Sequence, residues 1–330
     1  MKFELIKARI RTLPEVAAWP QMVDVVERAV HREGRSIWDY PFAASLAVGG
    51  TEEAALPGGA AVFCAMASIH LVDDILDEDP EGDYRRLGTG PAANLALAFQ
   101  AAAHRVLDSP TLPIVTAETR AALQESLAGM ALATAFGQNL DTRPLRSEEE
   151  YWQVLEAKTP PLFGMALYVG ALLGGAPQGV AESLQRLGHV MGRFIQVSDD
   201  LSDALKTPAG ADWRRRFHNL PILYAMTAEH PERDEFLHLA TRAGNPAALA
   251  AAQKILLRSG AVSYCALKLI ELSQQARQLL GSLPLADPGP VARLLEHQIK
   301  PLRQLFESMG VDEPAALTVE WAPEWALECG

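Results

Sequence analysis

The sequence predicts an all-α fold, and three features of the chain support this. Alanine and leucine dominate almost every segment, and both residues favour helices. Runs of β-branched residues with the period-two alternation of strands are nearly absent. Clusters of proline and glycine separate the apolar segments at intervals that fit helices. With 330 residues, 49% of them hydrophobic, the chain has enough apolar material for a large core.

Helical periodicity and these breakers together predict the individual helices. Turns are expected at residues 57–59, 88–91, 110–113, 208–210 and 284–290. Ser147 followed by Glu150 is typical of a capping box, and Pro160 with Pro161 predicts a kink or break just after Lys158. The expected helices are 14–33, 38–48, 58–79, 91–107, 115–138, 147–174, 178–206, 213–228, 232–241, 245–258, 261–281 and 287–309.

The chain is expected to form one domain. No linker rich in glycine, serine and proline interrupts residues 14–309, which favours a single all-α domain over residues 1–310. Residues 311–330 show no clear periodicity and are expected to form a C-terminal tail.

Composition excludes several classes of partner and compartment. The net charge of −12 argues against nucleic acid, because phosphate backbones require a basic surface. Three widely spaced cysteines form neither a disulfide framework nor a zinc pattern, so a reducing cytoplasm is expected. The longest apolar run, residues 162–176, is shorter than the roughly 20 residues that span a bilayer. Neither a secretory signal nor a transmembrane segment is therefore expected.

One short acidic pattern occurs twice, 126 residues apart. Residues 73–77 read DDILD and residues 199–203 read DDLSD, each at the end of an apolar stretch with helical spacing. Positions i and i+4 of a helix are stacked neighbours, so the outer aspartates of each motif share one face. Carboxylates on two facing helices repel unless a cation lies between them, and oxygen ligands select Mg²⁺-like ions. Because Mg²⁺ commonly shares its shell with phosphate oxygens, the two motifs predict a site for a metal-bound diphosphate.

These motifs and the residues around them resemble the trans-polyprenyl diphosphate synthases, the farnesyl and geranylgeranyl diphosphate synthase family. Besides two DDxxD motifs, residues 137–141 (GQNLD) are similar to the family's GQxxD, and Lys158 with Thr159 to its KT step. Residues 219–221 (NLP) resemble its TLP. The resemblance covers about residues 34–225 in the family's order. It implies the class I isoprenoid synthase fold, a helical bundle around a central cavity, and a homodimer.

The resemblance also implies a role for each motif residue. An allylic isoprenyl diphosphate is expected to ionise while Mg²⁺, three ions per active site, and cationic side chains stabilise the leaving group. Metal ligands are expected at Asp73, Asp74, Asp77, Asp199 and Asp203. Catalytic roles are expected for Asp73, Asp77, Asp199 and Lys158. Substrate contacts are expected from Arg85, Arg86, Lys158, Gln196, Lys206 and Gln138, with a buried helix–helix hydrogen bond as the alternative role of Gln138.

The residues one turn before the first acidic motif are expected to set the length of the prenyl chain. By resemblance, Ser68 and Ile69 form the floor under the chain, and neither is aromatic. Room for fifteen carbons or more is therefore expected. His70 is expected to be a core or supporting histidine and not a metal ligand.

The sequence departs from the family where isopentenyl diphosphate, the homoallylic partner, would bind. The family has an early basic GKxxRP-like motif, which corresponds to residues 34–41 here. If Pro41 matches the family's proline, Ile37, Trp38 and Tyr40 occupy its basic positions. Charge-assisted hydrogen bonds contribute roughly 1.5–3 kcal/mol each, so these replacements weaken a diphosphate pocket by several kcal/mol.

Two further family positions near the first acidic motif are also replaced. Met66 stands in place of a histidine and Phe63 in place of a glutamate, which leaves Arg35 and Arg86 as partners for a second diphosphate. The hypothesis is an intact allylic half-site beside a remodelled homoallylic half-site. The acceptor would then be isopentenyl diphosphate or, on this hypothesis, another nucleophile such as water or an internal double bond.

Two other functions share part of this pattern. A class I terpene cyclase acting on fifteen- to twenty-carbon diphosphates shares the fold and the first motif. Its usual second motif, (N/D)DxxSxxxE, does not fit, because Asp203 and Thr207 stand four and eight positions after Asp199. A non-catalytic regulatory subunit tends to lose acidic motifs, and both are present here. Prenyl transfer is the leading interpretation, and the two alternatives stay open.

Overall fold

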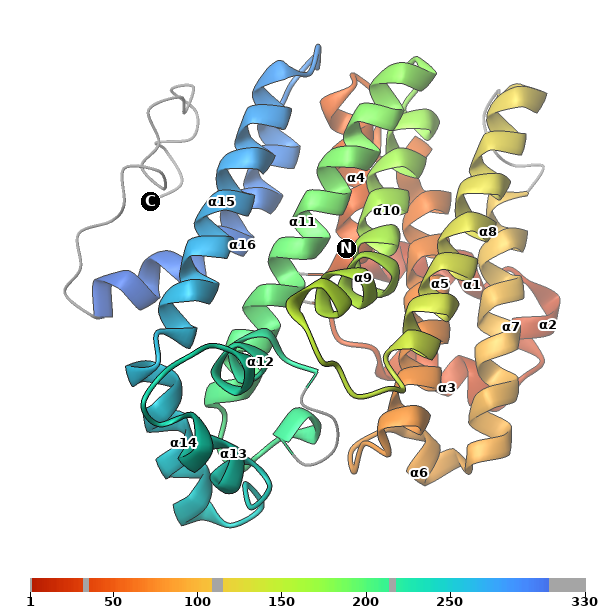
Figure 1. Ribbon diagram of the computed structural model, residues 1–330. Coiled ribbons are helices and arrows are strands. Elements are labelled where there is room, and N and C mark those ends of the chain that lie inside the picture. The colour runs from red at the N-terminus through yellow and green to blue at the C-terminus, as the bar shows by residue number, and fades with distance from the viewer. Residues whose placement is uncertain (1, 32–35, 109–114, 214–217, 309–330) are drawn as a thin grey trace.

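The computed structural model confirms the all-α prediction (Figure 1). It describes residues 2–31, 36–108, 115–213 and 218–308, which form helices and no strands. The α-helices are α1 (Lys2–Arg11), α2 (Pro14–Ala17), α3 (Pro20–Arg28), α4 (Tyr40–Ala47), α5 (Glu52–Asp77), α6 (Asp83–Leu87), α7 (Thr89–Leu107), α8 (Ala117–Leu140), α9 (Glu148–Lys158), α10 (Pro160–Leu173), α11 (Gln178–Leu205), α12 (Leu220–Thr227), α13 (Arg233–Ala240), α14 (Pro246–Arg258), α15 (Ala261–Ser282) and α16 (Gly289–Ser308). A 3-10 helix, η1 (Ile37–Asp39), precedes α4. The tail 311–330 lies outside the described residues.

The bundle is built around α10, in which every residue is buried. Figure 1 shows α10 and α11 at the centre, with α15 and α16 on one side and α5, α7 and α8 on the other. Glycines allow the central helices to approach closely. A Cβ at Gly170 would lie 2.3 Å from the carbonyl oxygen of Pro41 in α4, and one at Gly188 would lie 2.4 Å from that of Phe163 in α10. The contacts of α10 with α4 and α11 therefore need these two positions to lack a side chain.

The N-terminal helices differ from the expectation. The expected helix 14–33 is two shorter helices, because Trp19 is extended and Pro20 starts α3. The sequence interpretation missed α1, although Phe3, Ile6 and Ile10 are buried along one face at helical spacing. Arg35 lies outside the described residues.

The expected turn at residues 57–59 is wrong. Helix α5 starts at Glu52, after Thr51 accepts a hydrogen bond from the Ala54 backbone N–H at 3.1 Å, and it continues through Pro57. Gly58 and Gly59 serve close packing: added Cβ atoms would lie 3.0 Å from the Val169 side chain and 2.6 Å from that of Phe42. Glycines that allow helices to approach each other were thus interpreted as a loop signal.

The helix break near Pro160 is confirmed, since α9 ends at Lys158 and α10 begins at Pro160. Ser147 caps α9 by accepting a hydrogen bond from the Glu150 N–H at 3.2 Å. The Glu150 carboxylate reaches the N–H of Arg146 instead of that of the cap residue. The expected helix 213–228 begins only at Leu220, and residues 214–217 lie outside the described part of the chain.

The C-terminal ends of α5, α8, α9 and α11 carry the polar motifs to one region of the bundle. Asp77 ends α5, Asp141 follows α8, Lys158 ends α9 and Asp203 lies in the last turn of α11. Helix C-termini carry partial negative charge, which adds to the negative potential of the aspartates and favours binding of a cation in this region. By length and composition α5 could cross a membrane, but 61% of its apolar stretch is buried inside the bundle, as in a core helix.

The close approach of α10 to α4 gives a stability prediction. Gly170→Ala places a methyl group against the backbone of Pro41, so we expect a loss of about 1–3 kcal/mol in the free energy of unfolding. Nothing lies within 4 Å of a Cβ at the exposed Gly179 of α11, so Gly179→Ala should leave stability equal or slightly higher. Urea unfolding measures both. Equal stability of G170A and wild type would contradict this packing.

Candidate active site

A cavity of about 340 Å³ lies where these helix ends meet. Its polar wall contains seven aspartates and one lysine: Asp73, Asp77, Asp141, Asp199, Asp200, Asp203, Asp212 and Lys158. Its apolar wall includes Met66, Ile69, Leu145, Val154, Leu155, Leu162, Phe163 and Ile195. Lys158 is the single lysine or arginine among the described residues that line it. On α5 and α11 the apolar lining residues Met66, Ile69 and Ile195 precede the aspartates along the helix, so the cavity has an acidic end toward the helix C-termini and a more apolar end further back.

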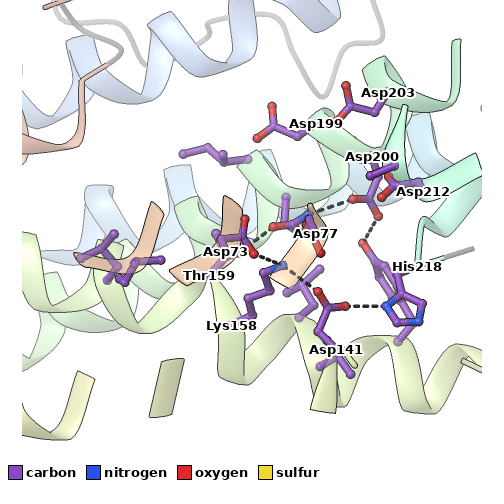
Figure 2. A pocket seen from close by; sticks show the side chains of 18 of the residues that line it. Asp73, Asp77, Asp141, Lys158, Thr159, Asp199, Asp200, Asp203, Asp212 and His218 are labelled. Carbon is purple, nitrogen blue, oxygen red and sulfur yellow. Dashed lines mark hydrogen bonds and ion pairs between the residues drawn. The ribbon is translucent and has the colours of Figure 1, made fainter. Parts of the chain in front are cut away.

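The outer aspartates of both motifs face this cavity. Figure 2 shows Asp73 and Asp77 on one side and Asp199 and Asp203 on the other. Asp199 is accessible to solvent through the cavity, yet protein surrounds it, and burial followed by the charge of Asp203 raises its pKa to about 6. No hydrogen bond to Asp199 is present within the described residues, so its oxygens are available to a ligand.

The middle aspartates of the motifs have different surroundings. Asp200 is buried and accepts hydrogen bonds from the Tyr151 hydroxyl at 2.7 Å, the Gln196 amide at 2.9 Å and the Leu220 N–H at 2.9 Å. Burial raises the pKa of Asp200 to about 6 despite these bonds. Asp200 thus ties α9, α11 and the start of α12 together.

Asp74, expected as a metal ligand, does not line the cavity. Its carboxylate lies at the start of α6, where the backbone of Asp83 hydrogen-bonds to it. Burial is the main cause that raises the pKa of Asp74 to about 6. Its role as a ligand stays a prediction, and the other four aspartates expected as ligands do line the cavity.

Lys158 is held between two carboxylates. Its Nζ lies 2.7 Å from Asp141 and 3.2 Å from Asp73, as the dashed lines of Figure 2 show. Burial opposes the positive charge, but Asp73 and Asp141 raise the pKa of Lys158 above its usual value. Asp141 is also bonded to His218 Nδ1 at 2.6 Å. Burial opposes its charge too, but the His218 hydrogen bond and Lys158 hold the pKa of Asp141 well below its usual range.

Other expected substrate contacts lie outside the cavity lining. Arg85 and Lys206 are exposed, with Lys206 paired to Asp203 at 3.1 Å. Arg86 forms ion pairs with Asp24 at 2.7 Å and Asp83 at 3.0 Å. These three cations reach the cavity only if their side chains move, so their substrate roles stay predictions.

The two expected glutamine contacts are engaged with protein groups. Gln138 donates a hydrogen bond to Asp73, which fits the alternative role foreseen for it. Gln196 lines the cavity, but its amide bridges Thr159, at 2.6 Å, and Asp200. In this structure both amides orient protein groups that face the cavity.

Of the two residues expected to form the floor under the prenyl chain, the structure places one in the cavity lining. Ile69 lines the cavity, whereas the half-buried Ser68 does not. An aromatic ring does line it, from another helix: Phe163 of α10, held edge-on against Tyr40 with ring centroids 5.3 Å apart. His70 is not a core residue, because its side chain is accessible and lines the cavity. The length of the accepted chain stays a prediction.

The sequence interpretation assigned no role to Asp141, His218, Tyr151 and Asp212. Asp141 was visible as the last residue of GQNLD, and Tyr151 stands seven residues before Lys158. His218 and Asp212 follow α11 without any motif, and only the fold brings them to the cavity.

The described residues contain no group of three or more His, Cys, Asp or Glu side chains close enough to hold a metal ion by themselves. Mg²⁺ is usually bound through one or two carboxylates together with waters and substrate phosphates. Pairs of aspartates on opposite walls fit that mode, in which the substrate completes the shell.

The sequence profile of the polyprenyl synthetase family matches residues 22–256. The protein belongs to the polyprenyl synthetase family. The (2E,6E)-farnesyl diphosphate synthase of Mycobacterium tuberculosis is 31% identical over 199 residues, which cover 56% of this chain and 54% of that protein. The chain thus matches about half the length of that relative.

Other members of the polyprenyl synthetase family align over more of the chain. The short chain isoprenyl diphosphate synthase of Methanothermobacter thermautotrophicus is 30% identical over 74% of this chain and 78% of its own length. A polyprenyl synthase structure from Caulobacter crescentus, complexed with calcium and isoprenyl diphosphate, has a TM-score of 0.74 at 21% identity. The structural alignment covers 91% of this chain and 92% of the Caulobacter crescentus protein, so the two proteins share a fold.

The buried acidic wall predicts an unusual dependence of stability on pH. Burial and the charge of Asp200 raise the pKa of Asp212 to about 7, so the folded protein holds this proton more tightly than the unfolded chain. This contribution to stability is full at low pH and is lost as the pH rises from about 4 through 7.

Asp212→Asn removes that dependence. Between pH 5 and pH 8, in EDTA, the variant should gain stability relative to wild type by more than about 1.4 kcal/mol, the equivalent of one pKa unit. Urea unfolding at the two pH values measures this. If the difference in the free energy of unfolding between D212N and wild type does not change with pH, the pKa of Asp212 is not raised by burial and this prediction is contradicted.

Proposed function

We propose that the protein is a prenyltransferase that ionises an allylic isoprenyl diphosphate with Mg²⁺ and transfers the prenyl group to an acceptor. One observation supports this above all: two pairs of aspartates oppose each other across the acidic end of a cavity whose other end is apolar. The acidic end suits a diphosphate with its metal ions, and the apolar end suits a prenyl chain.

The donor set of the cavity fits Mg²⁺. Asp73, Asp77, Asp199 and Asp203 offer hard oxygen ligands, and seven carboxylates face a single ammonium group in the described lining. The Caulobacter crescentus structure is complexed with calcium and isoprenyl diphosphate, which supports a divalent cation and an isoprenyl diphosphate as the ligands of this protein. The proposed number of ions is three, as the family resemblance implies. When bound, the metal stabilises negative charge on the leaving diphosphate.

The chain's own residues would carry the rest of the reaction. Lys158, held by Asp73 and Asp141, supplies a fixed positive charge for the leaving diphosphate. Ile69 and Leu155 surround the prenyl chain and keep water from the cation. The C–O bond breaks with its electron pair on the diphosphate, the acceptor's electron pair forms the new bond to C1, and the released diphosphate takes the acceptor's proton.

Product analysis separates this proposal from its alternatives. The protein is incubated with Mg²⁺ and geranyl, farnesyl or geranylgeranyl diphosphate, with and without isopentenyl diphosphate. A transferase requires an acceptor for efficient diphosphate release, whereas a cyclase releases diphosphate from the allylic substrate alone. Absence of release with every acceptor would point to a regulatory subunit.

Asp199, which accepts no hydrogen bond from the part of the chain that the structure describes, offers the cleanest catalytic test. Asp199→Asn should lower the rate of Mg²⁺-dependent diphosphate release by roughly 100-fold or more. Folding should be retained, because the substitution removes a carboxylate whose charge is opposed by burial. Asp108→Asn, at an exposed ion pair with Arg120, is the matched control and should keep full activity. Activity of D199N within about threefold of wild type would contradict the proposed site.

We also propose a homodimer, and the same cytoplasmic location that the cysteine content predicts. Support for the dimer comes from large apolar side chains that α7 and α8 expose: Leu97 (71%), Leu132 (74%) and Phe136 (58%). Leu132 and Phe136 are one turn apart on α8, so they share a face.

Phe136→Glu should convert a dimer into a monomer, because a carboxylate buried in an interface without a partner is strongly unfavourable. Leu257→Glu, at a residue of α14 exposed to 56%, is the matched control and should leave assembly unchanged. Light scattering after size-exclusion chromatography measures the mass. A wild-type monomer, or a dimer that persists in F136E, would contradict this interface.

A further inference from the structure

The ammonium group of Lys158 lies at the end of a series of polar contacts that begins at His218. Nδ1 of His218 lies 2.6 Å from one carboxylate oxygen of Asp141, and Nζ of Lys158 lies 2.7 Å from the other. The same Nζ lies 3.2 Å from Asp73, and Figure 2 shows the four side chains in this order. His218 is thus connected to the acidic motif of α5 through two intervening side chains.

The His218–Asp141 pair is shielded from water. The side chain of His218 is 6% exposed and that of Asp141 is 9% exposed. An ionised carboxylate only accepts hydrogen bonds, so Nδ1 of His218 carries the proton and donates it to Asp141. A hydrogen bond of this kind is stronger where water does not compete, and losing the donor leaves a buried carboxylate oxygen without it.

The backbone beside His218 is held by the second acidic motif. The side-chain amide of Asn219 donates to the carbonyl oxygen of Asp200 at 2.6 Å and to the carboxylate of Asp212 at 3.1 Å. The N–H of Leu220 donates to the carboxylate of Asp200 at 2.9 Å. His218 is therefore presented from a segment fixed to α11, and its ring links this segment to the residue that follows α8.

The two oxygens of Asp141 have different partners, and His218 keeps them apart. The terminal torsion of an aspartate is broad, so a carboxylate held at one oxygen only can rotate. With His218 on one oxygen, the other oxygen faces Lys158. An ammonium group has three N–H donors, and within the described part of the chain two of them face Asp141 and Asp73. The third can then donate to a phosphate oxygen in the cavity.

We propose that His218 is a positioning residue for the departure of the diphosphate. This inference rests on the proposed function. By holding Asp141, His218 fixes the ammonium group of Lys158 where negative charge grows as the C–O bond of the allylic diphosphate breaks. The electron pair of that bond stays on the diphosphate, and no proton moves to or from His218. A charge fixed in advance stabilises the leaving group without reorganisation during the reaction.

Two substitutions at His218 separate the hydrogen bond from the ring. His218→Phe keeps a planar ring and removes the donor, whereas His218→Asn keeps an N–H close to the position of Nδ1. The rate of diphosphate release is measured with Mg²⁺ and geranyl, farnesyl or geranylgeranyl diphosphate, with and without isopentenyl diphosphate. We expect H218F to lower this rate about tenfold, the effect of a weakened hydrogen bond to a charged group, and H218N to stay within about threefold of wild type.

The outcomes distinguish the inference from the proposed function. A wild-type protein that releases diphosphate from none of the three substrates overturns the proposed function, and the inference with it. Release by wild type, with an H218F rate within about threefold of it, overturns the inference alone. If H218F does not fold in urea unfolding experiments, His218→Gln, whose amide lies one bond further along the side chain, replaces it and should show the same loss.

Affinity before the bond breaks gives a second readout. Farnesyl thiolodiphosphate is an allylic analogue that ionises slowly, and calorimetry with Mg²⁺ measures its binding. We expect H218F to bind the analogue within about threefold of wild type, because the fixed charge of Lys158 acts mainly on the charge that grows in the transition state. A loss of affinity as large as the loss of rate would assign His218 to substrate binding and overturn the positioning role.

A double-mutant cycle tests whether His218 acts through Lys158. In the background of Lys158→Met, His218→Phe should lower the remaining rate by less than about twofold, because the charge that it positions is gone. The same tenfold loss in both backgrounds overturns the inference. His104→Phe is the matched control: Nδ1 of His104 is bonded to Gln124 at 2.5 Å, between α7 and α8, and His104 does not line the cavity. H104F should release diphosphate at the wild-type rate.

Discussion

Repulsion among carboxylates at one end of the bundle is the constraint on which the rest of the structure depends. Seven aspartates and one lysine line the described wall of the cavity, and burial raises the pKa of Asp199 and Asp212 to about 6 and 7. A protein gains no stability from such a wall unless a cation relieves it. We therefore interpret the acidic end as a site that is complete only when metal ions and a diphosphate bind. Binding of these ligands would offset the electrostatic cost of placing the aspartates together.

Packing far from the charges holds this wall in place. Close approach of α10 to α4 and α11 depends on Gly170 and Gly188, and the ends of the neighbouring helices then fall around one cavity. Asp200 fixes three segments through hydrogen bonds to Tyr151, Gln196 and Leu220. The aspartates that face the cavity are thus presented by rigid helix ends, which is what electrostatic stabilisation of a leaving group requires.

Local patterns in the sequence predicted the helices, the break before Pro160 and the two acidic motifs, because each depends on residues close along the chain. The same reasoning mistook Gly58 and Gly59 for a turn, since a glycine needed for helix contact has the same local signal as one in a loop. It also expects Asp74 among the metal ligands, which stays a prediction, and local patterns gave no sign that the backbone of Asp83 in α6 hydrogen-bonds to this carboxylate. No local pattern marked His218, and only tertiary structure brings it to Asp141 in the cavity wall.

The central claim is that the opposed acidic pairs hold a metal-bound diphosphate while the apolar wall holds its chain. A crystal structure of the protein with Mg²⁺ and farnesyl thiolodiphosphate tests this most directly. The account predicts the diphosphate between Asp73 and Asp199, with metal ions bridging both, and the farnesyl chain against Ile69 and Leu155. A ligand bound elsewhere, or metal ions that contact neither acidic motif, would contradict it.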